Sequence, residues 1–154
     1  PLLKFMSMLQ LNNTRIGLIL SYYGFGVALA VFLYHGFLKS VPRSIEEAAI
    51  VDGCSAFGVF RRIVFPLLRP TTITLVVLDV LWFWNDYMLP SIMLGSKKEN
   101  RTIPLTISFL FDQFNSRWDL AMAAITLAIV PVLIIFIAFQ KYIVTGISAG
   151  SVKG

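Results

Sequence analysis

Hydrophobic positions in this chain gather in three long stretches that are almost free of charged side chains. Residues 16–38 and 120–140 contain no Asp, Glu, Lys or Arg, and residues 70–96 contain only Asp79 and Asp86. A helix of about 20 apolar residues is long enough to cross a bilayer, because each residue adds about 1.5 Å along the axis. The pattern therefore predicts an all-α, polytopic transmembrane bundle with spans at about 16–38, 71–94 and 120–140.

Two prolines affect the expected geometry of the second and third spans. Pro70 stands just before the second span, and proline is well suited to the first turn of a helix, where its missing N–H leaves no bond unmade. Pro131 lies near the middle of the third span and removes one backbone hydrogen bond, so we expect a kink there. A helix bundle tolerates such a kink in the membrane.

Composition agrees with a membrane protein and excludes other classes. Of the 154 residues, 57% are hydrophobic and 14% are charged, and the mean hydropathy is +0.79. Soluble domains carry about 25% charged residues, so a soluble globular fold and a disordered chain are both excluded. The formal net charge is +5, but basic residues that flank membrane spans account for it, and we expect no nucleic-acid partner. The single cysteine, Cys54, rules out an intrachain disulfide.

The connection 39–70 is too polar to span a membrane and too regular in pattern for a linker. Ser44, followed three positions later by Glu47, has the form of a capping box, which predicts a short helix with Ser44 as N-cap. Gly53 is the expected stop, because glycine accepts the left-handed backbone conformation. This connection carries five Lys and Arg residues, which favours a cytoplasmic location.

A second short helix is expected at about 56–65. It places Phe57, Phe60 and Val64 on one face, and Pro66 is expected to end it. The connection 39–70 therefore predicts a helix, a glycine turn and a second helix that lie at the membrane surface.

At these residues the chain resembles the membrane subunits of bacterial binding-protein-dependent ABC importers. The EAA loop of that family combines a Glu-Ala-Ala, an Asp-Gly and an Ile-x-x-Pro-Leu at set offsets. The matching residues here are Glu47-Ala48-Ala49, Asp52-Gly53, and Ile63 with Pro66 and Leu67.

Further segments resemble the carbohydrate-uptake branch of the family, and its maltose-type permease subunits in particular. They are Trp84-Asn85-Asp86-Tyr87, Thr102-Ile103-Pro104-Leu105 and the C-terminal residues 149–154. Members of the family usually have six spans, and this chain begins with Pro1. We therefore expect it to be the C-terminal part of a longer permease, with the first spans missing.

The resemblance implies a multi-pass subunit of the bacterial inner membrane that assembles with two ATPase subunits, a second permease subunit and an extracytoplasmic solute-binding protein to import a sugar. In the family the EAA loop is the coupling helix that docks on the ATPase. The ATPase-coupling residues implied here are Glu47, Ala48, Ala49, Asp52, Gly53, Ile63 and Pro66. The carboxylate of Glu47 suits a charge-assisted contact with a basic partner, although it also suits a cap of its own helix. Three spans would place the C-terminus on the cytoplasmic side with the loop.

The residues give no support for catalysis by this chain. Gly53 and Gly58 have the glycine spacing of a phosphate-binding loop, but Val59 and Phe60 follow where lysine and serine or threonine are required. No Cys/His cluster has the spacing of metal ligands. We therefore expect no enzyme activity, no catalytic residue, no cofactor and no metal, and ATP hydrolysis falls to a partner subunit.

The acidic residues of the second span suggest a substrate path. A charge at mid-membrane costs about 2.5–3.5 kcal/mol on insertion scales, so Asp79 should face the bundle or a wet cavity. Trp82, Asn85 and Asp86 follow, and carboxylates, amides and aromatic rings are the groups that contact sugars. An aromatic belt at the span end explains the same residues. An ion-coupled secondary transporter or channel fragment that uses Asp79 is the alternative function; a scaffold would leave Asp79 unexplained.

The outward connection 95–119 carries an apolar stretch from Leu105 to Phe111 after Pro104. It suits either a contact with a solute-binding protein or a helix lying on the membrane surface, and the sequence leaves both open.

Overall fold

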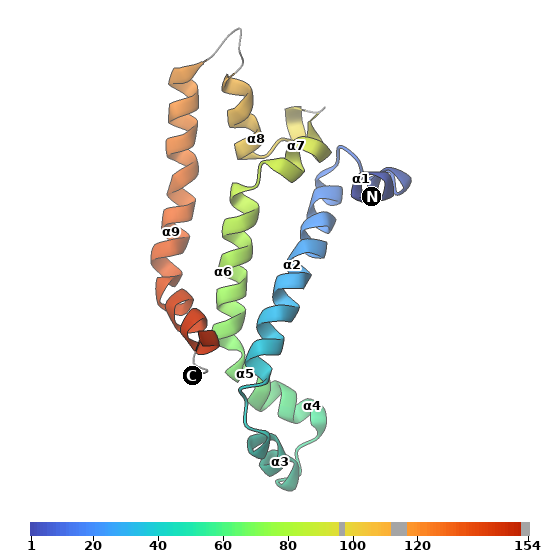
Figure 1. Ribbon diagram of the computed structural model, residues 1–154, viewed down its shortest axis with the longest axis vertical. Coiled ribbons are helices and arrows are strands. Elements are labelled where there is room, and N and C mark those ends of the chain that lie inside the picture. Colours follow the sequence, from blue (N-terminus) through green and yellow to red (C-terminus); the bar gives the residue numbers. More distant parts are fainter. Residues whose placement is uncertain (96–97, 112–116, 152–154) are drawn as a thin grey trace. The chain divides into compact units, whose positions relative to one another are not determined.

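The computed structural model describes residues 1–95, 98–111 and 117–151, and every element in these ranges is helical (Figure 1). The long helices are α2 (Arg15–Leu38), α6 (Arg69–Asn85) and α9 (Trp118–Ser151). The short helices are α1 (Leu2–Met8), α3 (Arg43–Val51), α4 (Ala56–Val59), α5 (Phe65–Leu67), α7 (Met88–Leu94) and α8 (Ile103–Ser108). A π-helical turn (Phe60–Val64) joins α4 to α5, and single 3₁₀ turns lie at Lys98–Asn100 and Phe109–Phe111. The prediction of an all-α chain is confirmed.

Two of the expected spans form as single helices. Helix α2 and the segment Trp118–Gln140 of α9 are both long and apolar enough to cross a membrane. Pro131 lies inside α9 without interrupting it. The C-terminal tail that carries part of the family resemblance, residues 149–154, lies partly outside the described residues.

The segment 71–94, predicted as one span, is divided between two helices, because α6 ends at Asn85 and α7 begins at Met88. The Asp86 carboxylate explains the break: its Oδ1 accepts a hydrogen bond from the Met88 backbone N–H at 3.0 Å. Such a local side-chain bond offers the backbone an alternative to the helical ladder. Ala56–Leu67 and α6 are together long and apolar enough for a third span, and the two segments are bent against each other by 62°.

The described chain divides into two compact units, and the first comprises Pro1–Gly26 with Asp79–Phe136. Its core brings α1, α2, α7 and α8 together through five buried side chains, Met6, Leu18, Met93, Leu94 and Leu105. The turn before α2 is fixed to α7 by a backbone hydrogen bond from Asn13 N to Met93 O at 3.0 Å.

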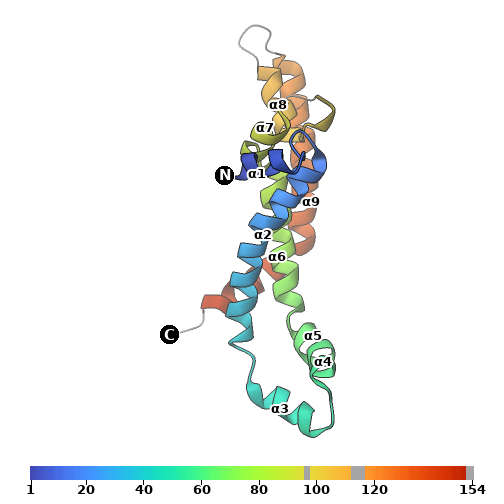
Figure 2. The same cartoon turned by 90° about the vertical axis from the view of Figure 1, so that its right-hand side faces the viewer.

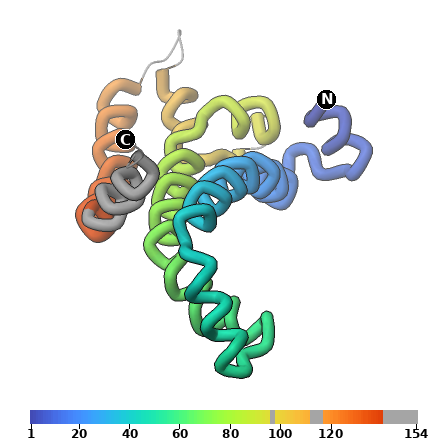
Figure 3. Tube along the Cα trace, turned by 60° about the horizontal axis from the view of Figure 1, so that its bottom comes forward, coloured from blue at the N-terminus to red at the C-terminus, as the bar shows by residue number. Residues whose placement is uncertain are grey.

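Within this unit α2 and α6 lie side by side, as the blue and green tubes of Figure 3 show. Their close approach depends on Gly26: a Cβ atom added there would lie 3.3 Å from Asp79 Oδ2 and 3.4 Å from Phe83 Cζ. Small residues allow this kind of close helix contact in membranes.

The second unit comprises Val27–Leu78 and the residues from Ile137 onward. Helix α3 and the helical segment 56–67 pack against each other in a hairpin, which Figure 2 shows most clearly. Its core consists of Ala49, Val59, Val64 and Leu68, and Tyr34 and Phe37 of α2 pack on this cluster. The hairpin is therefore held against its own flanking helix.

We expect Gly26→Val to destabilise the purified full-length protein, because the added side chain must displace the Asp79 carboxylate or the Phe83 ring. Overpacking of this kind costs about 1–3 kcal/mol and should lower the midpoint of thermal unfolding. Gly24→Val is the matched control, because a Cβ at Gly24 has no neighbour within 4 Å. Equal decreases in the two variants, measured by thermal unfolding in detergent, would contradict the close approach of α2 and α6.

Candidate functional site

The first candidate site is the hairpin formed by residues 39–70, and its first helix begins earlier than the capping-box pattern predicts. Pro42 is the N-cap of α3 and no side chain caps the helix, so the assignment of Ser44 as N-cap is wrong. Pro42 has an extended backbone (φ −64°, ψ 127°), and its carbonyl accepts the Ile45 N–H at 3.2 Å. Proline loses nothing at this position, because it has no N–H to leave unpaired. Glu47 is thereby freed from the reciprocal cap.

The turn between the two helices follows the sequence expectation. Gly53 has φ +83°, the left-handed region, directly after the end of α3. The Gly53 N–H donates to Ile50 O, and the Cys54 N–H donates to Ala49 O, both at 3.0 Å. This pair of bonds is a Schellman motif, which satisfies the last carbonyls of the helix and fixes the direction in which the chain leaves it.

The second helix of the hairpin runs longer than predicted. Ser55 caps its start, where its Oγ accepts the Gly58 N–H at 3.2 Å. Pro66 does not end the helix: it lies in the first turn of α5, where proline is tolerated, and the break follows at Leu68.

The three apolar residues expected on one face of this second helix differ in burial. Val64 is buried, whereas Phe57 is 69% exposed and Phe60 is 49% exposed, and Val59 contributes to the core. The π-helical turn changes the angular spacing of the side chains after Val59, so Val64 does not continue the face of Phe57 and Phe60.

The structure divides the EAA residues into two groups. Ala49 is buried and Ile63 is half-buried, and both contribute to the packing of the hairpin. Glu47, Ala48, Asp52, Gly53 and Pro66 are exposed. The first group thus stabilises the hairpin, whereas Glu47, Ala48 and Asp52 make an outward surface on α3.

Val51 belongs to this outward surface and was missed by the sequence analysis. It is 86% exposed, which is unusual for an apolar side chain in a packed hairpin. Its position gave a signal: two residues after buried Ala49, helical spacing turns it by about 200° to the opposite side of the helix.

Two hydrogen bonds, together called the polar tie below, connect the base of the hairpin to the helices on both sides of it. The Tyr34 hydroxyl of α2 hydrogen-bonds to Thr72 Oγ1 of α6 at 2.9 Å. Thr72 Oγ1 in turn donates to Leu68 O at 2.9 Å, at the bend where the hairpin meets α6. A displacement of the hairpin must therefore move α2 and α6 with it or break this tie.

The second candidate site lies along α6 in the other unit, where one face gathers three of the four predicted path residues. Asp79 and Trp82 lie three positions apart in α6, and Asp86 is the first residue after the end of that helix. The Tyr22 hydroxyl of α2 donates to Asp86 Oδ2 at 3.0 Å, and the Tyr22 ring stacks on Phe83 with ring centroids 4.3 Å apart. Tyr22 and Phe83 were not predicted, because no sequence pattern marks a tyrosine inside a span as a partner of a distant acid.

Asp79 also lies on this face. Its Oδ1 atom is buried and has no hydrogen-bond partner among the described residues. The residue as a whole is half-buried, and its other oxygen lies beside Gly26. The expectation that Asp79 faces the helix bundle agrees with its contact with α2. No group of three metal-ligating His, Cys, Asp or Glu side chains occurs within the described ranges.

Asn85, the fourth predicted path residue, is separated from the others. Its Nδ2 donates to Leu81 O at 2.7 Å, and the residue lines a cavity of about 460 Å³ between α6, α8 and α9. Trp84 lines the same cavity, and its indole N–H donates to Ala128 O at 3.1 Å. The cavity is mostly apolar, with Asn85 and Ser108 among its few polar lining residues.

Comparison with known proteins places these features in one family. Residues 1–149 match the model of the binding-protein-dependent transport system inner membrane component. The chain is 52% identical over 140 residues to a probable starch degradation products transport system permease protein of Thermoanaerobacterium thermosulfurigenes, an alignment that covers 91% of this chain and 51% of that protein.

Two further relatives align over nearly the whole chain. Identity is 37% to a multiple sugar-binding transport system permease protein of Streptococcus mutans, with 99% of this chain and 55% of the relative covered. It is also 37% to an arabinooligosaccharides transport system permease protein of Bacillus subtilis, with 100% and 54% covered. The chain thus spans about half the length of the curated relatives it matches.

We expect the Tyr22–Asp86 hydrogen bond to appear as a coupling energy in a double-mutant cycle. A hydrogen bond to a charged group contributes about 1.5–3 kcal/mol, so Tyr22→Phe should lose most of its effect once Asp86→Ala is present. Thermal unfolding of the four proteins measures this. Tyr23→Phe is the matched control, because Tyr23 is 70% exposed. Additive effects of Tyr22→Phe and Asp86→Ala would contradict the bond.

Proposed function

Because the chain belongs to the family of binding-protein-dependent transport system inner membrane components, we propose that it forms part of the permease subunit of an ATP-driven sugar importer. The names of three relatives specify starch degradation products, multiple sugars and arabinooligosaccharides. Together they favour a sugar or oligosaccharide substrate. The proposed assembly contains a second permease subunit, ATPase subunits and an extracytoplasmic solute-binding protein, and the ATPase subunits perform the hydrolysis.

The observation that carries the proposal is the packing of the hairpin 39–70 onto its flanking helices. Its core is buried, its turn is closed by a Schellman motif, and the Tyr34–Thr72 bond ties α2 to α6 at its base. A short helix held in this way transmits force, because it cannot move without moving the spans. We propose that α3 docks on the ATPase through its outward surface, with Glu47, Ala48 and Val51 in contact and Asp52 at its edge.

The surface formed by Asp79 and Trp82 of α6, with Asp86 directly after that helix, is the proposed border of the sugar path. Asp86 is oriented by Tyr22, and the half-exposed Trp82 ring offers an apolar face of the kind that sugars stack on. Asn85 is not included, since it lines the separate apolar cavity. Unchanged uptake kinetics in an Asp79→Asn, Asp86→Asn double variant would contradict this border.

The alternative, an ion-coupled transporter or channel that uses Asp79, has less support. The family match covers nearly the whole chain, and the relatives' names describe permease proteins of transport systems. Uptake that requires ATP and persists after the proton gradient is collapsed would favour the importer.

The coupling role predicts that Gly53→Val abolishes sugar uptake while the protein remains in the membrane. The added side chain meets no neighbour within 4 Å, so the change acts through the backbone: φ +83° costs a non-glycine residue about 1–2 kcal/mol. Relief of that strain tilts α3. Gly53→Asn is the matched control, because asparagine tolerates this conformation better, and it should retain more uptake. The measurements are uptake in cells and co-purification of the ATPase.

Glu47 tests the docking surface in the same assays. Glu47→Lys should reduce uptake and ATPase retention strongly, and Glu46→Lys, the same change one residue away at a half-buried position, should do less. Since no side chain caps α3, a loss in Glu47→Gln reports an ionic contact and not a lost cap. Normal uptake and ATPase retention in both Gly53→Val and Glu47→Lys would refute the coupling role.

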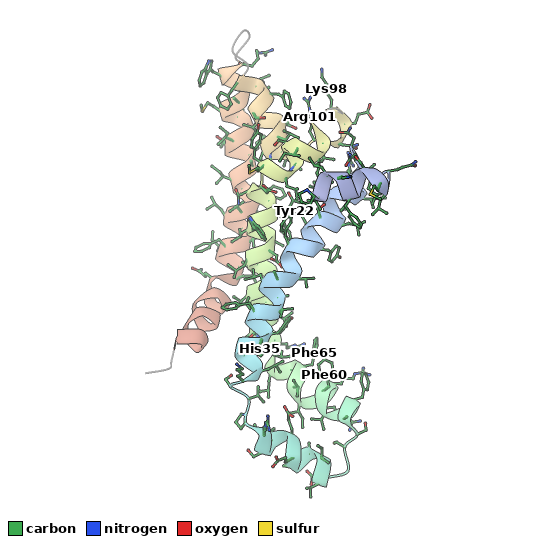
Figure 4. All side chains as sticks on the ribbon, turned by 45° about the vertical axis from the view of Figure 1, so that its right-hand side comes forward. Tyr22, His35, Phe60, Phe65, Lys98 and Arg101 are labelled. Atoms are coloured by element: carbon green, nitrogen blue, oxygen red, sulfur yellow. The ribbon has the colours of Figure 1, made fainter. Side chains whose placement is uncertain are left out.

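We also propose that the hairpin and the C-terminus face the cytoplasm. In a Cys54→Ser background, a cysteine at Lys98 should react with a membrane-impermeant thiol reagent added to intact cells. A cysteine at Val51, although 86% exposed, should react only after the cells are opened. Figure 4 shows Lys98 pointing away from the helices around it. The reverse labelling pattern would overturn this orientation.

A further inference from the structure

The second helix of the hairpin carries a surface that the proposed coupling role does not use. A cavity of about 530 Å³ opens there, and it is lined by Ser55, Phe57, Gly58, Arg61 and Arg62. Its size is within the range of small-ligand sites, about 300–1,000 Å³. The cavity lies on the segment 56–67, whereas the proposed docking surface lies on α3.

The charge of this cavity is positive and uncompensated. Arg61 and Arg62 are both exposed, and neither guanidinium forms an ion pair with any carboxylate in the described part of the chain. Guanidinium groups match the geometry of phosphate, to which they donate two parallel hydrogen bonds. Two free guanidiniums that line one cavity therefore favour a phosphate group as the ligand.

Exposed aromatic side chains accompany the two arginines. Phe57 is 69% exposed, and Phe60 and Phe65 are each 49% exposed. Phe60 and Phe65 contact each other with ring centroids 6.1 Å apart, and Figure 4 shows both on the same helical segment. Arginines together with exposed aromatic residues on a short helix are typical of segments that lie in the membrane interface.

The connection to α6 is short enough for this segment to lie at the depth of the lipid headgroups. Five residues, 68–72, separate it from Ile73, the first large aliphatic residue of α6, and five residues cover about 7 Å along a helix. The polar region on each side of the bilayer is about 5–8 Å thick. With α6 tilted by about 20°, the bend of 62° turns the segment far from the membrane normal.

We propose that Arg61 and Arg62, with Ser55, bind the phosphate of an anionic phospholipid in the cytoplasmic leaflet, while Phe57 and Phe60 contact the glycerol and upper acyl region. The bound lipid holds the segment 56–67 on the membrane surface. This site is independent of the proposed coupling contact, because it uses neither α3 nor a partner protein.

The test uses the complete importer, reconstituted in phosphatidylcholine vesicles that contain a few per cent of a photoreactive phosphatidylglycerol. After illumination, mass spectrometry measures the label on the peptides of the hairpin. Each basic residue near an anionic surface contributes about 1 kcal/mol, so Arg61→Gln, Arg62→Gln together should lower the apparent lipid affinity about 30-fold. Arg61→Lys, Arg62→Lys, which keeps the charge and loses the paired hydrogen bonds, should lie between this variant and the unchanged protein.

The matched control is Lys39→Gln, Arg43→Gln, which removes the same charge from the same connection, outside the cavity. Labelling of the segment 56–67 should change less than threefold in this control. Unlabelled phosphatidylglycerol should compete with the label, and phosphatidylcholine and inorganic phosphate should not. Equal competition by phosphatidylcholine, or by inorganic phosphate, would overturn the proposal, and so would undiminished labelling in the double glutamine variant.

ATPase co-purification, measured on the same samples, separates this proposal from the coupling role. The double glutamine variant should lose the lipid label and keep the ATPase. Loss of the ATPase with the label retained would mean that Arg61 and Arg62 contact the ATPase, and the lipid site would be wrong. Loss of coupling in Glu47→Lys with unchanged labelling would leave the lipid site intact.

Discussion

A helix in hydrocarbon must satisfy its backbone hydrogen bonds internally, and this constraint decides where the chain can depart from helical geometry. At both ends of α6 a polar side chain hydrogen-bonds to the backbone next to the break, and a tyrosine of α2 hydrogen-bonds to that side chain. In one unit Thr72 donates to Leu68 O and meets Tyr34. In the other, Asp86 accepts the Met88 N–H and the Tyr22 hydroxyl. Each break in the helix is thereby also a contact between α2 and α6.

The dependence of helix breaks on single hydrogen bonds explains which parts of the fold could be predicted from the sequence and which could not. The charge-free stretches predict α2 and α9, because burial in lipid acts on every residue of a span. The position of a break depends instead on single hydrogen bonds. Nothing in the pattern of residues 71–94 shows that Asp86 will bond to the Met88 N–H rather than face a cavity, so the break between α6 and α7 was not predicted.

In the EAA loop, too, some features could be predicted from the sequence and others could not. The sequence places Gly53 correctly, since a left-handed turn leaves few alternatives to glycine. The sequence identifies the motif as a whole, but it does not show which residues of the motif pack inside the hairpin and which face outward. The exposure of each side chain depends on how the second helix packs against α3. Ala49 turns inward and Glu47 outward, because two positions along a helix turn a side chain by about 200°, and Val59 lies in the core whereas Phe57 is exposed.

The two helices of the hairpin also differ in charge, and this difference favours separate partners for them. Helix α3 carries Glu46 and Glu47 with one basic residue, Arg43, and Asp52 directly follows it, whereas the segment 56–67 carries Arg61 and Arg62 and no acidic residue. An acidic surface is repelled by anionic headgroups, and a basic one is attracted to them, by about 1 kcal/mol for each charge. In the proposed arrangement, these charges favour an orientation with the second helix toward the membrane and α3 away from it. A proposed docking helix held off the lipid in this way would be accessible to an ATPase without first having to leave the membrane surface.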